Sequence, residues 1–475
     1  MIRKAITLSV MLFGAAITGM AQEAWSLENC IQYAMENNIQ IKQSVLNTEY
    51  NENLLKQSKL GQIPNLNASS NYSFSWGRAL DQTTYQFTDD QQIHSLSMGF
   101  SSSVNLFSGL RVRNTILQNE LNLMASYEDV EKIKNDISLN IAAAYLSIMF
   151  NQELLAVTVS QMEITGQQVE RTQKMVDAGK LARGNLLELE AQYASEELNL
   201  VNAENQLSIS LLNLQQILAL PIDTAFGIDI PILTDPDENP LAISALEVYR
   251  IAELEMPQIK SAELAKESSE KGLKIAEGGR SPQLYLSANY NSGYSDIREQ
   301  VVELGDPQQI PIGITQNSGD PVLSYPQQIP VYGAYPFFEQ MRDNTSAGVG
   351  LGLSIPIFNG WQVNTSIANA RIALENSNLE LQNKKLTLYA SIQQAYADAL
   401  AALKKFNATE RALISMEESF KYTEKKFEVG LVNTVDYNMS KNQLTATQSD
   451  LLQAKYDFIF RIKILNFYKG DPITL

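Results

Sequence analysis

The chain has 475 residues, of which 44% are hydrophobic and 19% are charged, so it is long and apolar enough to bury a large core. Its formal net charge of −17 at pH 7 disfavours nucleic acid as a partner, because binding to phosphates needs a surplus of Lys and Arg. The acidic balance is consistent with simple solubility or with a water-filled passage that favours cations. The one cysteine, Cys30, cannot form an intrachain disulfide.

Residues 1–21 have the layout of a cleavable secretory signal. Arg3 and Lys4 precede an apolar stretch, and the small residues Gly19 and Ala21 end it. Gln22, and not a cysteine, directly follows this point, so we do not expect lipid attachment there. No later stretch reaches the roughly 18 uninterrupted apolar residues that a spanning helix needs. We therefore expect an exported protein, and if it enters a bilayer we expect it to do so as strands.

The rest of the chain is an internal duplication. Residues 104–222 align with residues 355–473 at a constant shift of 251 without a gap, and upstream the shift becomes 218. Self-similarity of this length indicates two copies of one structural unit. We predict a first repeat at 22–222, a linker at 223–242 and a second repeat at 243–475.

Each repeat is predicted to contain three helical segments and one β-hairpin, which follows the first of these segments. Two long segments lack proline and would each span roughly 100 Å as continuous helices. Apolar residues of the second long segment form two rows on nearly opposite sides, which is typical of a helix with two neighbours, as in a ring of helices. A plain structural coiled coil is the alternative. The predicted rods are Ser26–Leu60, Leu110–Ala178 and Asn185–Ala219 in the first repeat, and Ile243–Glu277, Trp361–Val429 and Asp436–Gly470 in the second.

Four segments alternate apolar residues with Ser, Asn and Gly at a period of two, which predicts strands with one apolar and one polar face. Strands of this length suit a bilayer, where roughly 9–11 tilted residues span the hydrocarbon. We therefore predict that one set of side chains faces lipid. Its members are Leu66, Tyr72, Phe74, Trp76, Leu96, Met98, Phe100, Leu284, Tyr290, Val349, Leu351 and Leu353.

Four strands leave two open edges, and each unpaired backbone group in lipid costs several kcal/mol. Closure of the sheet therefore requires several chains. Two chains would give an eight-stranded barrel filled by its own side chains, whereas three would give twelve strands around a passage wide enough for water. We infer a homotrimer, with a tetramer also open. The alternative is an exposed two-hairpin sheet on a soluble helical protein.

The loop inside the second hairpin, 297–345, contains six of the fifteen prolines of the chain and is predicted to be irregular surface outside the cell. At the other end, Gly179 and Gly430 are predicted to stop the two long helices. The turns that follow, Gly179-Lys180-Leu181 and Gly430-Leu431-Val432, would form the tip.

Six residues after each glycine, Asn185 and Asp436 lie where the returning helices start, so both can cap a helix or occupy its first turn. A functional alternative is a gate. In that interpretation Asp436 and Glu188, repeated by symmetry, ring the narrow end with negative charge and hold a gate through hydrogen bonds. Asn185 is the third candidate gate residue.

The ordered pattern of helix, hairpin, long helix, turn and helix, together with the strand exits Leu106 to Gly109 and Ile357 to Gly360, resembles the TolC family of outer-membrane efflux proteins. The resemblance implies a mixed, mainly α fold. Its trimer would form a 12-stranded outer-membrane β-barrel continued by a periplasmic α-helical barrel, with the tip docked on a periplasmic adaptor and an inner-membrane pump.

The chain departs from the family pattern at the tip. Leu181 and Val432 stand where family gates often carry a basic residue, and Asn185 stands where an acid is common. Lys180 and Arg183 are the nearby candidates for a substitute ionic lock.

The resulting functional hypothesis is a passive exit duct for small toxic compounds in the outer membrane. No glycine-rich phosphate loop with its lysine appears, so energy would come from the partners. The single histidine, His94, has no cysteine or histidine cluster near it in sequence, which disfavours an enzyme, and we expect no cofactor or metal. Secretion of proteins or peptides and a surface structural or adhesive coiled coil are the alternatives.

Overall fold

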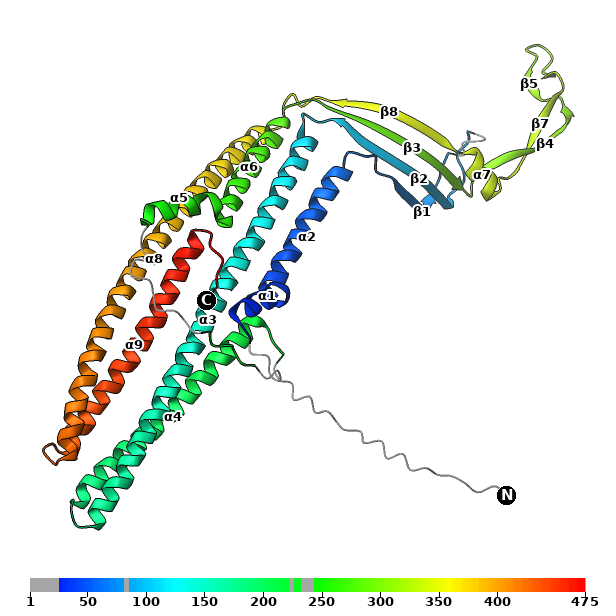
Figure 1. Cartoon of the computed structure of the whole chain (residues 1–475). Helices are drawn as coiled ribbons and strands as arrows, with labels where there is room; N and C mark the ends of the chain where they lie inside the picture. The colour runs from blue at the N-terminus through cyan, green and yellow to red at the C-terminus, as the bar shows by residue number, and fades with distance from the viewer. Residues whose placement is uncertain (1–24, 81–84, 222–225, 232–242, 475) are drawn as a thin grey trace, which may run out of the picture. The chain divides into compact units, whose positions relative to one another are not determined.

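The computed structural model describes residues 25–80, 85–221, 226–231 and 243–474. Within them the chain is mainly helical with a smaller set of strands (Figure 1), which confirms the predicted mixed, mainly α class. The predicted signal peptide, 1–21, lies outside the described residues, as does most of the predicted linker.

The chain divides into two compact units, and each draws on both halves of the sequence. The helical unit comprises Met1–Asn51, Leu121–Lys266 and Asn376–Leu475. The strand unit comprises Glu52–Glu120 and Glu267–Glu375. The two compact units therefore do not correspond to the two sequence repeats.

The helices of the two halves match one another in length. The successive pairs have 11 and 11, 22 and 22, 67 and 67, and 36 and 35 residues. Both long helices form without interruption, as predicted. The helices are α1 (Leu27–Asn37), α2 (Ile39–Leu60), α3 (Arg111–Asp177) and α4 (Arg183–Leu218) in the first half, and α5 (Ala245–Glu255), α6 (Pro257–Gly278), α8 (Gln362–Glu428) and α9 (Thr434–Tyr468) in the second.

The prediction of one continuous helix at the start of each half is wrong, because both are interrupted after 11 residues. Asn38 is extended (ψ 132°), and its side chain accepts from the N–H of Gln40 (2.8 Å) while it donates to the carbonyl of Ile217 (2.8 Å). At the second break Met256 is extended (ψ 124°), since the ring of Pro257 disfavours a helical conformation in the residue before it.

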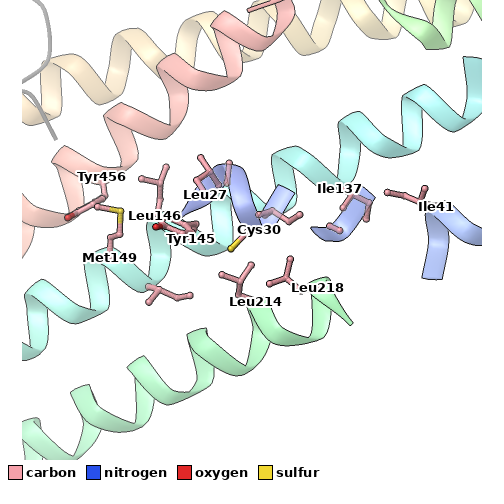
Figure 2. Close-up of a cluster of buried hydrophobic side chains, with 14 residues drawn as sticks. Leu27, Cys30, Ile41, Ile137, Tyr145, Leu146, Met149, Leu214, Leu218 and Tyr456 are labelled. Atoms are coloured by element: carbon pink, nitrogen blue, oxygen red, sulfur yellow. The ribbon is translucent and has the colours of Figure 1, made fainter. Parts of the chain in front are cut away.

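The main core of the helical unit surrounds Tyr145, which is fully buried on α3 (Figure 2). Side chains from α1, α4 and α9 close around it. The Tyr145 hydroxyl donates to the backbone carbonyl of Trp25 at 3.0 Å, and the N–H of Asp229 donates to the same carbonyl oxygen at 3.0 Å. The labelled core residues are Leu27, Cys30, Ile41, Ile137, Tyr145, Leu146, Met149, Leu214, Leu218 and Tyr456.

Among the described helices, α3 contains an 18-residue window that is long and apolar enough to cross a membrane. The same helix supplies Ile141, Tyr145 and Met149 to the main core, where all three are buried. Packing against α1 and α4 therefore accounts for part of its apolar character, since 39% of that window is buried.

The strand unit contains a four-stranded antiparallel sheet with the order β1-β2-β3-β8 (Figure 1). Its pairing places the apolar residues of neighbouring strands opposite one another: Tyr72 lies opposite Leu96, and Phe100 lies opposite Tyr290. The outer strands β1 and β8 form the two edges. The strands are β1 (Asn67–Gly77), β2 (Gln91–Phe107), β3 (Gln283–Ser295) and β8 (Ser346–Ser354).

The apolar face of this sheet is largely uncovered. Ten of the twelve residues predicted to face lipid are exposed, and Leu96 and Leu284 are half-buried. One detail of the alternation is wrong, because a register shift between Asn105 and Phe107 places Phe107, and not Leu106, opposite Leu284. An extra residue in one strand reverses the side that each following side chain takes.

The polar face explains the glycines of β8. A Cβ at Gly352 would overlap the ring of Tyr285 on β3, and one at Gly348 would come within 2.9 Å of the Asn289 side chain. Glycine on β8 therefore makes room for the larger polar side chains of the neighbouring strand.

The turn from β2 into α3 touches the end of α6 backbone to backbone. A Cβ added at Gly109 would lie 2.5 Å from the carbonyl oxygen of Gly278, and a Cβ at Gly278 would lie equally close to that of Gly109. Gly109 also has a left-handed backbone, with φ of +65°. Its counterpart in the second half, Gly360, has φ of +59° but no atom within 4 Å of its Cβ position.

The prediction that 297–345 is irregular is wrong. The segment folds into β4 (Glu299–Gln308), β5 (Pro311–Ile314), β6 (Pro321–Leu323), β7 (Gln327–Ala334) and α7 (Phe337–Asp343). β4 pairs with β7 and β5 pairs with β6. Short runs of valine and isoleucine between the prolines favour strands, and bulges accommodate prolines that cannot donate to a ladder.

Candidate functional site

The candidate site lies at the two turns of the helical unit, residues 178–182 between α3 and α4 and residues 429–433 between α8 and α9, which we call the tip. Both turns end a helix in the same way. The N–H of Gly179 donates to Val176 and that of Lys180 to Met175, each at 2.9 Å. The N–H of Gly430 donates to Phe427 at 3.0 Å and that of Leu431 to Lys426 at 2.9 Å.

This paired bonding is the Schellman motif, in which a left-handed residue closes the last turn of a helix. Gly179 has φ of +71° and Gly430 has φ of +76°. The predicted helix stops are therefore confirmed, and glycine is needed because other residues adopt this backbone only at a cost.

The two returning helices start differently. Asn433 caps α9, since its side-chain oxygen accepts from the N–H of Asp436 at 2.8 Å. Asp436 occupies the first turn and is exposed, so it favours the helix through its charge. α4 begins after Ala182 without a side-chain cap, and Asn185 lies in its first turn. Sequence reasoning missed Asn433, although an asparagine directly before a helix is a recognised cap signal.

A cavity of about 530 Å³ lies between the two turns. Five of the nine predicted tip and gate residues line it: Leu181 and Asn185 from the first turn, and Gly430, Leu431 and Val432 from the second. Gly179, Lys180, Glu188 and Asp436 are exposed and lie outside its lining. The other lining residues are Gln168, Arg171, Thr172, Met175, Phe427, Glu428, Asn433 and Thr434.

An ion pair crosses this cavity from one half of the chain to the other. The guanidinium of Arg171 on α3 lies 3.4 Å from the carboxylate of Glu428 on α8, and both side chains are about half exposed. Neither residue was predicted to belong to the gate, because the predicted gate residues all follow the two glycines and this pair precedes them. The pair is open to water, so we expect it to orient the turns more than to stabilise them.

The wall beside the cavity is aromatic. The ring of Tyr437 stacks on that of Phe427 with centroids 4.6 Å apart. The ring of Phe420 also contacts Tyr437, in a tilted arrangement with centroids 5.5 Å apart. Burial raises the pKa of Tyr437 to about 12, so its hydroxyl stays protonated. This hydroxyl and the side-chain oxygen of Asn438 are buried without a hydrogen-bond partner.

Further along the helices, a buried charged cluster joins the two halves. Lys441 on α9 reaches between α3 and α4, where its ammonium donates to Glu196 at 3.2 Å, to the carbonyl of Gln161 at 3.0 Å and to the hydroxyl of Thr165. The Thr165 hydroxyl in turn donates to Glu196 at 2.5 Å. Lys441 is 3% exposed and Glu196 is 6% exposed.

Burial lowers the pKa of Lys441, and the negative charge of Glu196 opposes that shift. The sequence contains a signal for this cluster that was not used. Glu196 falls in a seven-residue row with Leu189, Ala203 and Ser210, all buried on α4. A charged residue inside a buried row indicates a partner on the facing helix.

In the part of the chain that the structure describes, no group of three or more His, Cys, Asp or Glu side chains is placed to hold a metal ion. His94 pairs with Phe74 in the sheet, and its ring nitrogen lies 2.9 Å from the Tyr72 hydroxyl. Among the predicted site residues, those of the tip are brought together by the structure, since residues from both turns line one cavity.

A sheet with one exposed apolar face and one face of Ser, Asn and Gly is typical of a class, outer-membrane β-proteins, whose strands meet lipid on one side and water on the other. Comparisons with known proteins give the family. The family model described as "Outer membrane efflux protein" matches residues 30–220 and 248–459. The chain belongs to this family, and its outer-membrane location follows.

Individual relatives are distant but match along nearly the whole chain. The outer membrane protein TolC of Escherichia coli (strain K12) is 21% identical over 453 residues, which cover 94% of this chain and 83% of that protein. The alkaline protease secretion protein AprF of Pseudomonas aeruginosa is 21% identical over 470 residues, covering 98% and 88%. Crystal structures of CusC share the fold, with a TM-score of 0.74, 16% identity and coverage of 94% and 92%.

Proposed function

We propose that three copies of this chain form one outer-membrane duct that passively conducts small toxic molecules out of the cell. Membership of the outer membrane efflux family supports the class of activity. The observation that carries the trimer is the four-stranded sheet: its apolar face is exposed, and the outer edges of β1 and β8 pair with no other described strand. Unpaired edges in lipid are too costly for one copy to remain alone.

Three copies would place β8 of one chain beside β1 of the next and close twelve strands into a barrel. Eight strands would leave an interior filled by side chains, whereas twelve leave room for water. The small polar face of each sheet would then line the passage, and the exposed aromatic residues Tyr72, Phe74 and Trp76 would lie toward lipid.

The long helices support the same assembly. On α8 the row Ile367, Leu374, Leu381 and Leu388 is buried or half-buried within the chain. The second predicted row, Ile372, Leu379 and Leu386, is 52–67% exposed. An exposed apolar row of this kind can pack against a helix of a neighbouring copy. We propose that it does so, and that the helices of the three copies together form a ring that continues the barrel.

The tip would contact the partners. In this proposal Gly179, Lys180, Leu181, Gly430, Leu431 and Val432 dock on a periplasmic adaptor, which links the duct to an inner-membrane pump. The cavity between the two turns offers a mixed polar and apolar surface for such a contact. The duct itself carries no catalytic role in this proposal, because energy is supplied by the pump.

The test is conductance of the purified full-length protein in planar bilayers, together with chemical cross-linking in detergent. We expect stable ion-conducting channels, a preference for cations and a cross-linked series that ends at three copies. A monomer in detergent that also leaves native membranes after a salt wash would contradict both the barrel and the duct.

Asp436 provides a test of the gate. The Asp436→Asn variant removes a charge from the first turn of α9 but leaves its cap, Asn433, in place. If Asp436 and Glu188 ring the narrow end, we expect raised single-channel conductance with only a small fall in melting temperature, since a first-turn charge contributes about 0.3–1 kcal/mol. The matched control is Asn433→Ala, which should lower stability by about 1 kcal/mol through loss of the cap. Unchanged conductance in Asp436→Asn would argue against a charge gate at this position.

Export of a protein or peptide through the same duct is the second candidate. It is favoured by the similarity to AprF, whose name assigns it to secretion of an alkaline protease. Deletion of the gene for this chain distinguishes the two: sensitivity to small toxic compounds supports efflux, and loss of a protein from the medium with unchanged sensitivity supports secretion.

A further inference from the structure

The segment between β3 and β8 forms an extension of the strand unit that the duct does not explain. We call residues 299–334 the outer ribbon: β4 pairs with β7, and β5 with β6 forms its end. β3 starts after α6 and β8 leads into α8, so the helices join the opposite end of these strands. The outer ribbon therefore stands at the end of the sheet opposite α6 and α8.

Both faces of the outer ribbon carry exposed apolar side chains, and the second face also carries Glu303 opposite Val331. Val301 lies opposite Tyr332, and Leu304 on the same face lies opposite Pro330. Ile329 and Val331 alternate with these residues along β7 and so occupy the other face. Val301, Leu304 and Tyr332 are 39–57% exposed, and Ile329 and Val331 are 39–50% exposed.

Such a ribbon is at best marginally stable alone, because two strands bury little apolar surface. Its edges are poorly suited to a further strand. Pro307 and Pro330 lie within β4 and β7 and lack the N–H that a ladder needs. A partner is therefore expected to pack on the faces of the ribbon and not on its edges.

The connection to β8 indicates which partner this is. β8 is the edge strand that meets the next copy if the barrel closes, so the ribbon emerges beside a neighbouring chain. If two identical ribbons packed through the same face, the contact would be self-complementary and would cover only one face of each ribbon. A head-to-tail contact uses two different faces and closes into a ring when the rotation permits.

We propose that the outer ribbons of three copies pack face to face in a ring, the surface of Val301, Leu304 and Tyr332 on one copy against the surface of Ile329 and Val331 on the next. The ring forms a collar at the outer mouth that lengthens the passage beyond the barrel. This inference rests on the proposed trimer, and it assigns both apolar faces of the ribbon to the same kind of partner, a second copy of this chain.

The test uses two variants that each add one cysteine, Val301→Cys and Val331→Cys, made as full-length proteins with tags of different size. Each is expressed alone, and both are expressed together, before treatment of the membranes with a short bismaleimide. The native Cys30 does not interfere, because it is fully buried and its pKa is raised to about 12. The untreated wild type gives the background.

The expected result is a cross-linked pair that carries both tags, formed only when the two variants are expressed together. Cross-linked pairs from either variant alone would show a self-complementary contact and overturn the ring. A protein that keeps its three-copy native size without any cross-link would overturn the collar and leave the duct standing. Loss of the three-copy size in the wild type would instead remove the proposed trimer on which the collar depends.

Discussion

Replacing Lys441 with methionine is expected to lower the free energy of unfolding of the helical unit by about 3–5 kcal/mol, the range for removing one partner of a buried ion pair. The variant leaves the carboxylate of Glu196 only 6% exposed and without its cation. Thr165 and Gln192 still donate to Glu196, but neutral donors cannot balance its charge. Thermal and urea unfolding followed by circular dichroism measure the loss.

The double variant Lys441→Met/Glu196→Leu is the matched companion. Replacing both members of a buried pair with apolar residues is often neutral or stabilising, so this variant should recover most of the lost stability. Lys174→Met is the surface control, since its partner Glu170 and Lys174 itself are at least 70% exposed, and its unfolding midpoint should not move. A single variant Lys441→Met as stable as the wild type would show that the cluster does not hold the halves together.

Gly109→Ala is expected to reduce assembly of the protein in the membrane sharply, whereas the same change at Gly360 should have a smaller effect. Both positions require a left-handed backbone, which costs an alanine about 1–2 kcal/mol. Only at Gly109 would the new methyl group also press on a backbone oxygen, that of Gly278, for a further cost of about 1–3 kcal/mol. The yield of folded, membrane-inserted protein and its melting temperature measure the difference.

The pair is informative because the two glycines occupy equivalent places in the two halves. Equal losses in both variants would mean that the backbone conformation alone matters at this turn. A milder result for Gly109→Ala than for Gly360→Ala would contradict the close approach of the two backbones. Gly278→Ala should reproduce only the part of the Gly109→Ala defect that comes from the close contact, since it meets that contact from the other side but is not among the left-handed glycines.

Several features were predictable because they depend on residues close together in sequence. The period of two over 67–77 and 346–354 set which side chains share a face, and the glycines at 179 and 430 set where the long helices stop. Both effects are properties of the backbone and of neighbouring side chains, which the sequence carries directly. The duplication then placed each feature twice.

Other features depend on residues that are distant in sequence. The ion pair of Arg171 and Glu428 and the cluster of Lys441 with Glu196 join segments about 250 residues apart, and no local pattern specifies which charges meet. The break at Asn38 depends on a hydrogen bond to Ile217, and the order in the outer ribbon depends on pairing across its strands. The sequence by itself determined the class, the repeat, the amphipathic strands and the turns of this protein. Only the tertiary structure decided which buried polar groups pair across the two halves, because burial and partner choice arise when distant surfaces pack together.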